Sequence, residues 1–243
     1  MKYVIILVAF FLSAETINSQ SISKSNSYFD LAGTVGKKQG STAASYVYNW
    51  RIGSRKKIEV GIGGRWTTYF GSKKDFITAG PAKYTRSFTV PFVIFFAGQR
   101  EENFDTLTVQ RPLINSLNAM INIGYHFNSK WYAGFNIDVI GVTFGRKSSS
   151  IFTRNGITST DPESKPSAFN LLLTGDHDKG SLNSEFYIRY KIASRWTIKA
   201  VYQFLFVEYK SQSVHQTFPD GKTNDLFRNK ANNFGLGVSY FLN

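Results

Sequence analysis

The stretch "FYIRYKIASRWTIKAVYQFLFVEYK", Phe186 to Lys210, alternates between two kinds of side chain on both sides of a central "ASR". Its apolar positions are Phe186, Ile188, Tyr190 and Ile192, followed after the break by Trp196, Ile198, Ala200, Tyr202, Phe204 and Phe206. This period of two predicts two β-strands joined by a tight turn. The direction of the apolar face decides the class of protein, because it points inward in a soluble sandwich and outward in a membrane barrel.

The same period recurs along the chain, and no long window has the period of a helix. Most of the predicted strands exceed the usual soluble length and match the 9–11 residues of a membrane-spanning strand. We predict strands at 27–36, 42–53, 58–71, 115–127, 131–147, 181–193, 196–211 and 231–243.

The predicted connections alternate between short turns and long polar segments. "YHFNSKW" (Tyr125 to Trp131) recurs as "YKIASRW" (Tyr190 to Trp196) and, more loosely, as "WRIGSRK" (Trp50 to Lys56). Each copy ends one strand and begins the next with small polar residues that suit a turn. The segments 72–114, 148–180 and 212–230 read as long loops. Short turns in the periplasm and long loops outside are typical of an outer-membrane barrel.

The start of the chain indicates export. Lys2 precedes an apolar run from Tyr3 to Ala14, too short for a membrane-spanning helix, and this is typical of a signal peptide. We expect a signal peptide at 1–19, a short periplasmic segment at 20–26 and a barrel domain at 27–243. The 243 residues contain no cysteine, and their formal net charge of +13 indicates an acidic partner. Because the chain is expected to be exported, we do not expect nucleic acid to be this partner.

Two further features favour an outward apolar face. Trp50, Trp131 and Trp196 all lie near the short turns, as in an interfacial girdle of aromatic residues. The opposite faces are rich in glycine, which fits a crowded interior. An open sheet edge in hydrocarbon would leave backbone groups without partners. We therefore predict an all-β fold, a closed antiparallel transmembrane β-barrel of eight strands.

The chain resembles the small outer-membrane β-barrel proteins of the eight-stranded OmpA/OmpX type. The resemblance covers the mature chain and includes the last strand, "NFGLGVSYFLN", whose apolar positions alternate toward the C-terminus like the terminal assembly signal of that family. The family usually ends in Phe, whereas Leu242 and Asn243 stand here. The resemblance implies an outer-membrane location and contact with outer-membrane lipid, lipopolysaccharide and the barrel-assembly machinery.

The segment 72–114 leaves an alternative open. "SFTVPFVIFFAG", Ser87 to Gly98, alternates and could add a strand paired with 104–113, which would make ten strands. Pro91 and Pro112 weaken this interpretation. The other interpretation is a loop that caps or plugs the barrel mouth. A wider barrel could hold a small hydrophobic molecule, so a transporter or binder of such a molecule is an alternative function.

Charged residues fall on the predicted inward face. A barrel of eight strands is filled by side chains, and buried charges must pair because an unpaired one is costly. We predict a lumen charge network that fills the barrel, with a gated ion path as the lesser alternative. Its members are Asp30, Arg51, Glu59, Arg65, Asp138, Glu185, Arg189, Lys191 and Lys199.

No catalytic, cofactor-binding or metal motif stands out in the sequence. His126 is expected in the lumen near a periplasmic turn, His177 lies in the loop sequence "DHD", and His215 has no carboxylate pattern nearby. We therefore expect no enzyme, cofactor or metal site, with an outer-leaflet lipid-modifying enzyme as the remote alternative. The main hypothesis is a structural or surface-interaction role in contact with lipopolysaccharide.

Three basic residues are candidates for lipid contact. Arg146, Lys147 and Lys210 each close a predicted lipid-facing strand at the outer rim. A basic residue beside an anionic lipid surface contributes about 1 kcal/mol to binding. We therefore expect these three side chains to bind lipid phosphates, and the alternative is that they form only a solvated rim.

Overall fold

The fold is a single antiparallel sheet of thirteen strands with a separate two-stranded hairpin. The computed structural model describes residues 23–90, 97–173 and 178–242. The predicted signal peptide lies outside these residues. The strands of the sheet are β1 (Ser25–Gly36), β2 (Gln39–Ile52), β3 (Ile58–Gly71), β4 (Lys73–Thr78), β5 (Thr106–Gln110), β6 (Leu113–His126), β7 (Trp131–Gly145), β8 (Ser148–Arg154), β9 (Ile157–Pro166), β10 (Phe169–Leu171), β11 (Leu182–Lys191), β12 (Trp196–Lys210) and β15 (Leu226–Phe241).

The small elements lie in the connections between these strands. They are the one-turn helix α2 (Ala82–Thr85), the 3-10 helix η2 (Glu101–Asn103) and the hairpin β13 (Gln216–Thr217) and β14 (Thr223–Asn224). Among the described residues, no helix is long and apolar enough to cross a membrane.

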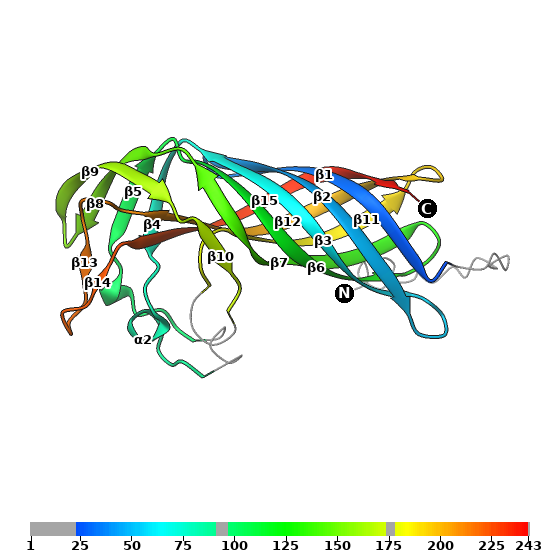
Figure 1. Ribbon diagram of the computed structural model, residues 1–243, viewed down its shortest axis with the longest axis horizontal. Coiled ribbons are helices and arrows are strands. Elements are labelled where there is room, and N and C mark those ends of the chain that lie inside the picture. The colour runs from blue at the N-terminus through cyan, green and yellow to red at the C-terminus, as the bar shows by residue number, and fades with distance from the viewer. Residues whose placement is uncertain (1–22, 91–96, 174–177, 243) are drawn as a thin grey trace, which may run out of the picture.

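Eight long strands pair in a closed ring. The pairings run from β1 through β2, β3, β6, β7, β11 and β12 to β15, which pairs with β1 again. Each of these strands contains most of one segment predicted from the sequence. The short turns between β2 and β3, β6 and β7, and β11 and β12 lie together at one end, on the right of Figure 1.

At the other end, the sheet divides into a second ring. β12 and β15 are longer than their neighbours, so their free edges pair with β9 through Lys210 and with β4 through Arg228. β4, β5, β8 and β9 then pair in order. These four strands and the ends of β12 and β15 form the extension on the left of Figure 1. The two rings therefore share one hairpin.

This extension corrects the sequence prediction. The segments 72–114, 148–180 and 212–230 are not plain loops, and the sheet has thirteen strands rather than eight or ten. The strand at 106–110 pairs with β4 and β8, whereas Ser87 to Val90 belong to no strand, so the ten-stranded pairing of 87–98 with 104–113 is wrong. Residues 91–96 lie outside the described part. The strand β9, which contains two prolines, forms because its neighbours pair with it.

In the eight-stranded ring, the apolar face points outward. Ile62 and Leu236 are 57% and 73% exposed, whereas Asn122 and Asp138 on the opposite face are fully buried. The alternation shifts once, in β7, where Ala119 and Met120 pair with Ile140 and Asp138 and leave Val139 out of the register. Such a β-bulge adds one residue to a strand and reverses the faces beyond it.

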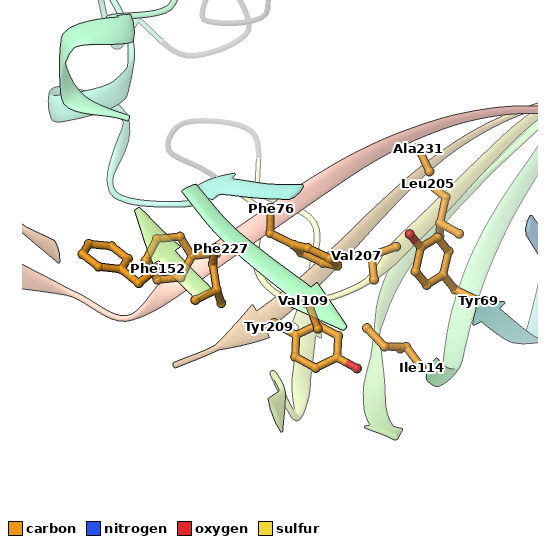
Figure 2. Packing of buried hydrophobic residues seen from close by; sticks show 11 residues of the cluster. Tyr69, Phe76, Val109, Ile114, Phe152, Leu205, Val207, Tyr209, Phe227 and Ala231 are labelled. Carbon is orange, nitrogen blue, oxygen red and sulfur yellow. The ribbon is translucent and has the colours of Figure 1, made fainter. Parts of the chain in front are cut away.

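In the extension, the interior becomes apolar. Phe76 from β4, Val109 from β5, Phe152 from β8, Val207 from β12 and Phe227 from β15 pack together (Figure 2). The cluster continues past Tyr209 to Tyr69 and Ile114 of the eight-stranded ring (Figure 2), and the Tyr209 hydroxyl donates to the carbonyl of Arg146 at 3.0 Å. The second ring is thus built like a water-soluble domain on top of a ring with the opposite arrangement.

Candidate functional site

The interior of the eight-stranded ring holds a buried network of charges. Arg65 on β3 donates from Nε and Nη2 to Oδ1 of Asp138 on β7, at 2.9 and 2.5 Å. The other carboxylate oxygen of Asp138 accepts from Asn118 at 2.7 Å and from the backbone N–H of Asn183 at 2.9 Å. Each of the two oxygens of the Asp138 carboxylate therefore accepts two hydrogen bonds.

The network continues across the ring with alternating sign. Nη1 of Arg65 lies 3.5 Å from Glu185 on β11, and Lys199 on β12 contacts Glu185 at 3.1 Å. Lys199 also donates a short hydrogen bond to Asp30 on β1. Nη2 of Arg189 lies 3.9 Å from the other oxygen of Asp30. Three acids thus face three bases in one buried chain of contacts.

Aromatic rings surround the Arg189 end of this charge network. The Arg189 guanidinium lies 4.3 Å from the ring centre of Tyr28 and 4.9 Å from that of Tyr187, with Tyr132 and Phe241 nearby. Such cation–π contacts stabilise a cation that has little access to water. They also fill the lumen with bulky side chains.

A separate charge cluster lies near the short turns. Glu59 accepts from Arg51 at 2.9 Å and contacts Nε2 of His126 at 2.8 Å. Asn26 and Asn49 donate to the same carboxylate. His126 is therefore placed in the lumen near a turn, as the sequence indicated, and acts as a partner of Glu59.

One predicted member of the network lies elsewhere. Lys191 is exposed at the end of β11, where the strand leaves the ring. The other eight predicted members, including the part-buried Arg51, divide between the two clusters described above. The period of two placed Lys191 on the inward face but gave no information about how deep in the lumen it would lie.

The predicted girdle residues all lie at the turn end. Trp50 and Trp196 are exposed on the outer surface, and Trp131 is half-buried. Trp131 packs on Tyr190 with ring centres 4.8 Å apart, and Trp196 packs on Tyr240 at 4.9 Å. Aromatic pairs across neighbouring strands therefore surround this end.

The three predicted lipid-contact residues lie at the boundary between the two rings. Arg146 is exposed, and its Nη1 donates to the Arg111 carbonyl at 3.4 Å. Lys147 pairs with Glu163 on β9 at 3.1 Å, and Lys210 pairs with Asp225 at 3.0 Å. Two of the three charges thus already have an acidic partner, which the sequence did not indicate because these acids lie in segments read as loops.

A further buried ion pair was not predicted from the sequence. Arg228 on β15 donates to Glu208 on β12 at 2.7 Å, directly across the shared hairpin. This pair lies on the face of β12 that carries Phe206, yet it is buried because the segment around Gly180 covers it. The break of the apolar pattern at Glu208 was the available signal.

The segment with α2 is attached to the β13–β14 hairpin. The ring of Tyr84 stacks on Phe218 with centres 4.1 Å apart, and its hydroxyl donates to Asp220. This hydrogen bond holds the pKa of Asp220 below its ordinary value. A Cβ on Gly80 would lie 2.6 Å from Phe218, so only glycine permits this approach.

His177 and His215 are the other two histidines of the sequence. His177 lies outside the described residues, and no group of three or more His, Asp or Glu side chains able to hold a metal is found among the described ones.

Comparisons with known proteins give a distant likeness only. No protein-family model and no curated protein matches the chain. Among solved structures it is similar to Neisserial surface protein A (NspA), with a TM-score of 0.35 and 10% identity over 90% of this chain and 97% of that one. It is also similar to Ail, the attachment invasion locus protein of Yersinia pestis, in complex with the heparin analogue sucrose octasulfate. There the TM-score is 0.32, with 11% identity over 90% of this chain and 97% of that one. Likenesses this distant assign no function.

Proposed function

We propose that the chain is an outer-membrane β-barrel protein with a structural or surface-interaction role. The observation that carries this proposal is the reversed arrangement of the eight-stranded ring, with apolar side chains outward and a buried network of ion pairs inward. In water, such a continuous apolar surface would be a strong aggregation hazard. In a bilayer, it is the surface that hydrocarbon requires.

The height of the apolar surface supports a membrane-spanning orientation. The outward stripe of β12 runs from Trp196 to Phe206, which is ten steps along the strand. Ten steps at about 3.3 Å each give roughly 33 Å of strand. A tilt of about 40° reduces this to a height of ~25 Å, the height of the apolar band of outer-membrane barrels.

The buried network favours a structural role over transport. Arg65, Asp138 and Glu185 cross the ring and are almost fully buried. Charges placed in this way fill the interior and hold opposite strands together. The water-soluble extension would then project from the outer face and offer surface for interaction. We infer a non-catalytic role, reached by signal-directed export and insertion by the barrel-assembly machinery.

Contact with lipopolysaccharide is the finer part of the proposal. Arg146, Lys147 and Lys210 would lie at the level of the outer headgroups, where lipid phosphates are dense. Lys147 and Lys210 would share their charge between a carboxylate and lipid, so we expect Arg146 to contribute most.

The test is the triple variant Arg146→Gln, Lys147→Gln and Lys210→Gln. Purified from outer membranes, it should retain several-fold less lipopolysaccharide than the wild type while keeping the heat-modifiable gel migration of a folded barrel. Arg195→Gln, at the opposite end, is the matched control. Equal retention in both variants would contradict lipopolysaccharide contact at this rim and leave the barrel assignment untouched.

A further inference from the structure

A cavity of about 240 Å³ lies on the outer wall of the shared hairpin. Its floor includes Phe204 and Phe206 of β12, and its walls include Arg228 and Lys230 of β15 and Arg86, which follows α2. Figure 1 shows α2 and the connection around β10 on the same side of the extension, where both contribute lining residues. The cavity is therefore separate from the lumen and from the rim residues already discussed.

Arg228 has an unused donor in this cavity. The residue is 6% exposed, and its Nη2 binds Glu208 and the carbonyl of Asp178. Its Nε is buried and has no hydrogen-bond partner among the described residues. The guanidinium is held 4.9 Å from the ring centre of Phe206. A buried donor without a partner costs free energy, so a ligand that accepts from it would be stabilised.

Two further cations share the cavity. Lys230 is half-buried opposite Phe206, and no carboxylate of a described residue lies within ion-pair distance of it. Arg86 and Arg228 repel its charge, and Asp178 only partly offsets them. Arg86 itself makes a long hydrogen bond of 3.4 Å to the Ala97 carbonyl. Like charges in a shielded cavity are unfavourable unless an anion joins them.

The floor of the cavity is continuous with the lipid-facing stripe. Phe204 and Phe206 follow Tyr202 on the outward face of β12, are partly buried, and line the cavity together with Thr85 and Leu173. A molecule that lay along this stripe would bring its apolar part to the two rings and its polar end to the three cations. A water-soluble anion would contact only the three cations and not the two rings.

We infer that this cavity binds the phosphate-bearing headgroup of one membrane lipid, whose acyl chain lies along β12 on Phe204 and Phe206. Arg86, Lys230 and Nε of Arg228 donate to the phosphate. Phosphate suits this set because it accepts several charge-assisted hydrogen bonds at once. The inference rests on the proposed membrane location of the ring, and it names a lipid site distinct from the rim of Arg146.

The experiment compares ligands that differ in one part only. Folded protein, delipidated in a non-ionic detergent, is titrated with dioleoyl phosphatidic acid, dioleoylglycerol or inorganic phosphate, and bound lipid is counted by native mass spectrometry. We expect one phosphatidic acid per chain, bound at least about tenfold more tightly than either other ligand, since each good charged contact is worth roughly a factor of ten. Equal affinity for inorganic phosphate would overturn the lipid assignment, and equal affinity for dioleoylglycerol would overturn the phosphate assignment.

Variants then assign the site. Lys230→Gln with Arg86→Gln should weaken phosphatidic acid binding by at least about tenfold, and Arg86→Gln alone, in the connection after α2, by several-fold. Lys191→Gln, exposed at the turn end of β11 and far from the cavity, is the matched control. Unchanged binding in the folded double variant would overturn the inference. This assay is done in detergent, so a negative result would count against the lipid site and not against the membrane location of the ring. The membrane location is tested by a separate measurement.

Discussion

Arg65 and Asp138 form an ion pair across the inside of the ring, with Nη2 and Oδ1 2.5 Å apart and both side chains inaccessible to water. One residue comes from β3 and the other from β7, so the pair connects strands that are not neighbours. Removing one partner of a buried pair leaves a charge without compensation, whereas removing both does not.

The pair gives a prediction about stability. Arg65→Met should lower the free energy of unfolding by about 3–5 kcal/mol, because Asp138 and Glu185 lose their shared cation. Adding Asp138→Leu should recover part of this loss. Urea unfolding in detergent micelles measures both. Lys191→Met, on the exposed end of β11, is the control and should change stability by less than about 0.5 kcal/mol. An equal loss of unfolding free energy in the control would show that the Arg65–Asp138 pair does not contribute more to stability than an exposed charge.

The second prediction concerns ion flow. Because the network and the aromatic rings around Arg189 fill the ring, wild-type protein in a planar bilayer should give no large steady currents. Replacing Arg65 and Glu185 together with Ala should open a path and raise the frequency of channel events. Large, steady single-channel currents from the wild type would contradict a filled lumen.

The third prediction concerns orientation. Ser129, in a short turn, and Ser149, in β8 of the extension, are both exposed. The chain has no cysteine, so Ser149→Cys and Ser129→Cys each introduce a unique thiol. In intact cells, a membrane-impermeant maleimide should label the first variant and not the second, while both should be labelled after lysis. The reverse pattern would place the extension in the periplasm.

The fourth prediction concerns the segment that covers the lipid cavity. Tyr84→Phe removes the donor to Asp220, so the pKa of Asp220 should rise toward its ordinary value of 3.8. In the wild type, the contact is present above that value and is lost as the pH falls through the lowered pKa. Carbon-13 NMR of the aspartate carboxyls measures the change. An unchanged Asp220 pKa would mean that this hydrogen bond is not formed.

Gly80→Ala should weaken the attachment of the α2 segment to the β13–β14 hairpin by a steric effect. The added methyl group would meet the ring of Phe218, so the stacking on Tyr84 would weaken. Proteolytic cleavage between α2 and η2 should become faster than in the wild type, whereas Gly64→Ala, where a Cβ would meet nothing within 4 Å, should leave it unchanged.

The sequence predicted the eight-stranded ring well because each of its strands has one apolar face. Glu59, Arg65 and Asp138 were placed inward by period alone, and the structure brings each to a partner. The extension could not be predicted in this way. β8 and β9 are rich in Ser and Thr and have no clear apolar face, and they are strands because neighbours from 106–110 and 209–210 supply the pairing. The bulge at Val139 also reverses the faces, and its signal in the sequence is the switch of the apolar positions from Ile137 and Val139 to Ile140, Val142 and Phe144.

Contact between the outward apolar face and lipid hydrocarbon is the basis of the proposed function. Spin labels at Ile62→Cys and Leu236→Cys, both strongly exposed on this face, measure it directly in bilayers by collision with oxygen and with a water-soluble nickel complex. Ser149→Cys in the extension is the water-exposed control. We predict high oxygen and low nickel collision rates at Ile62 and Leu236, with the opposite at Ser149. Nickel collision rates at Ile62 and Leu236 as high as at Ser149 would contradict it.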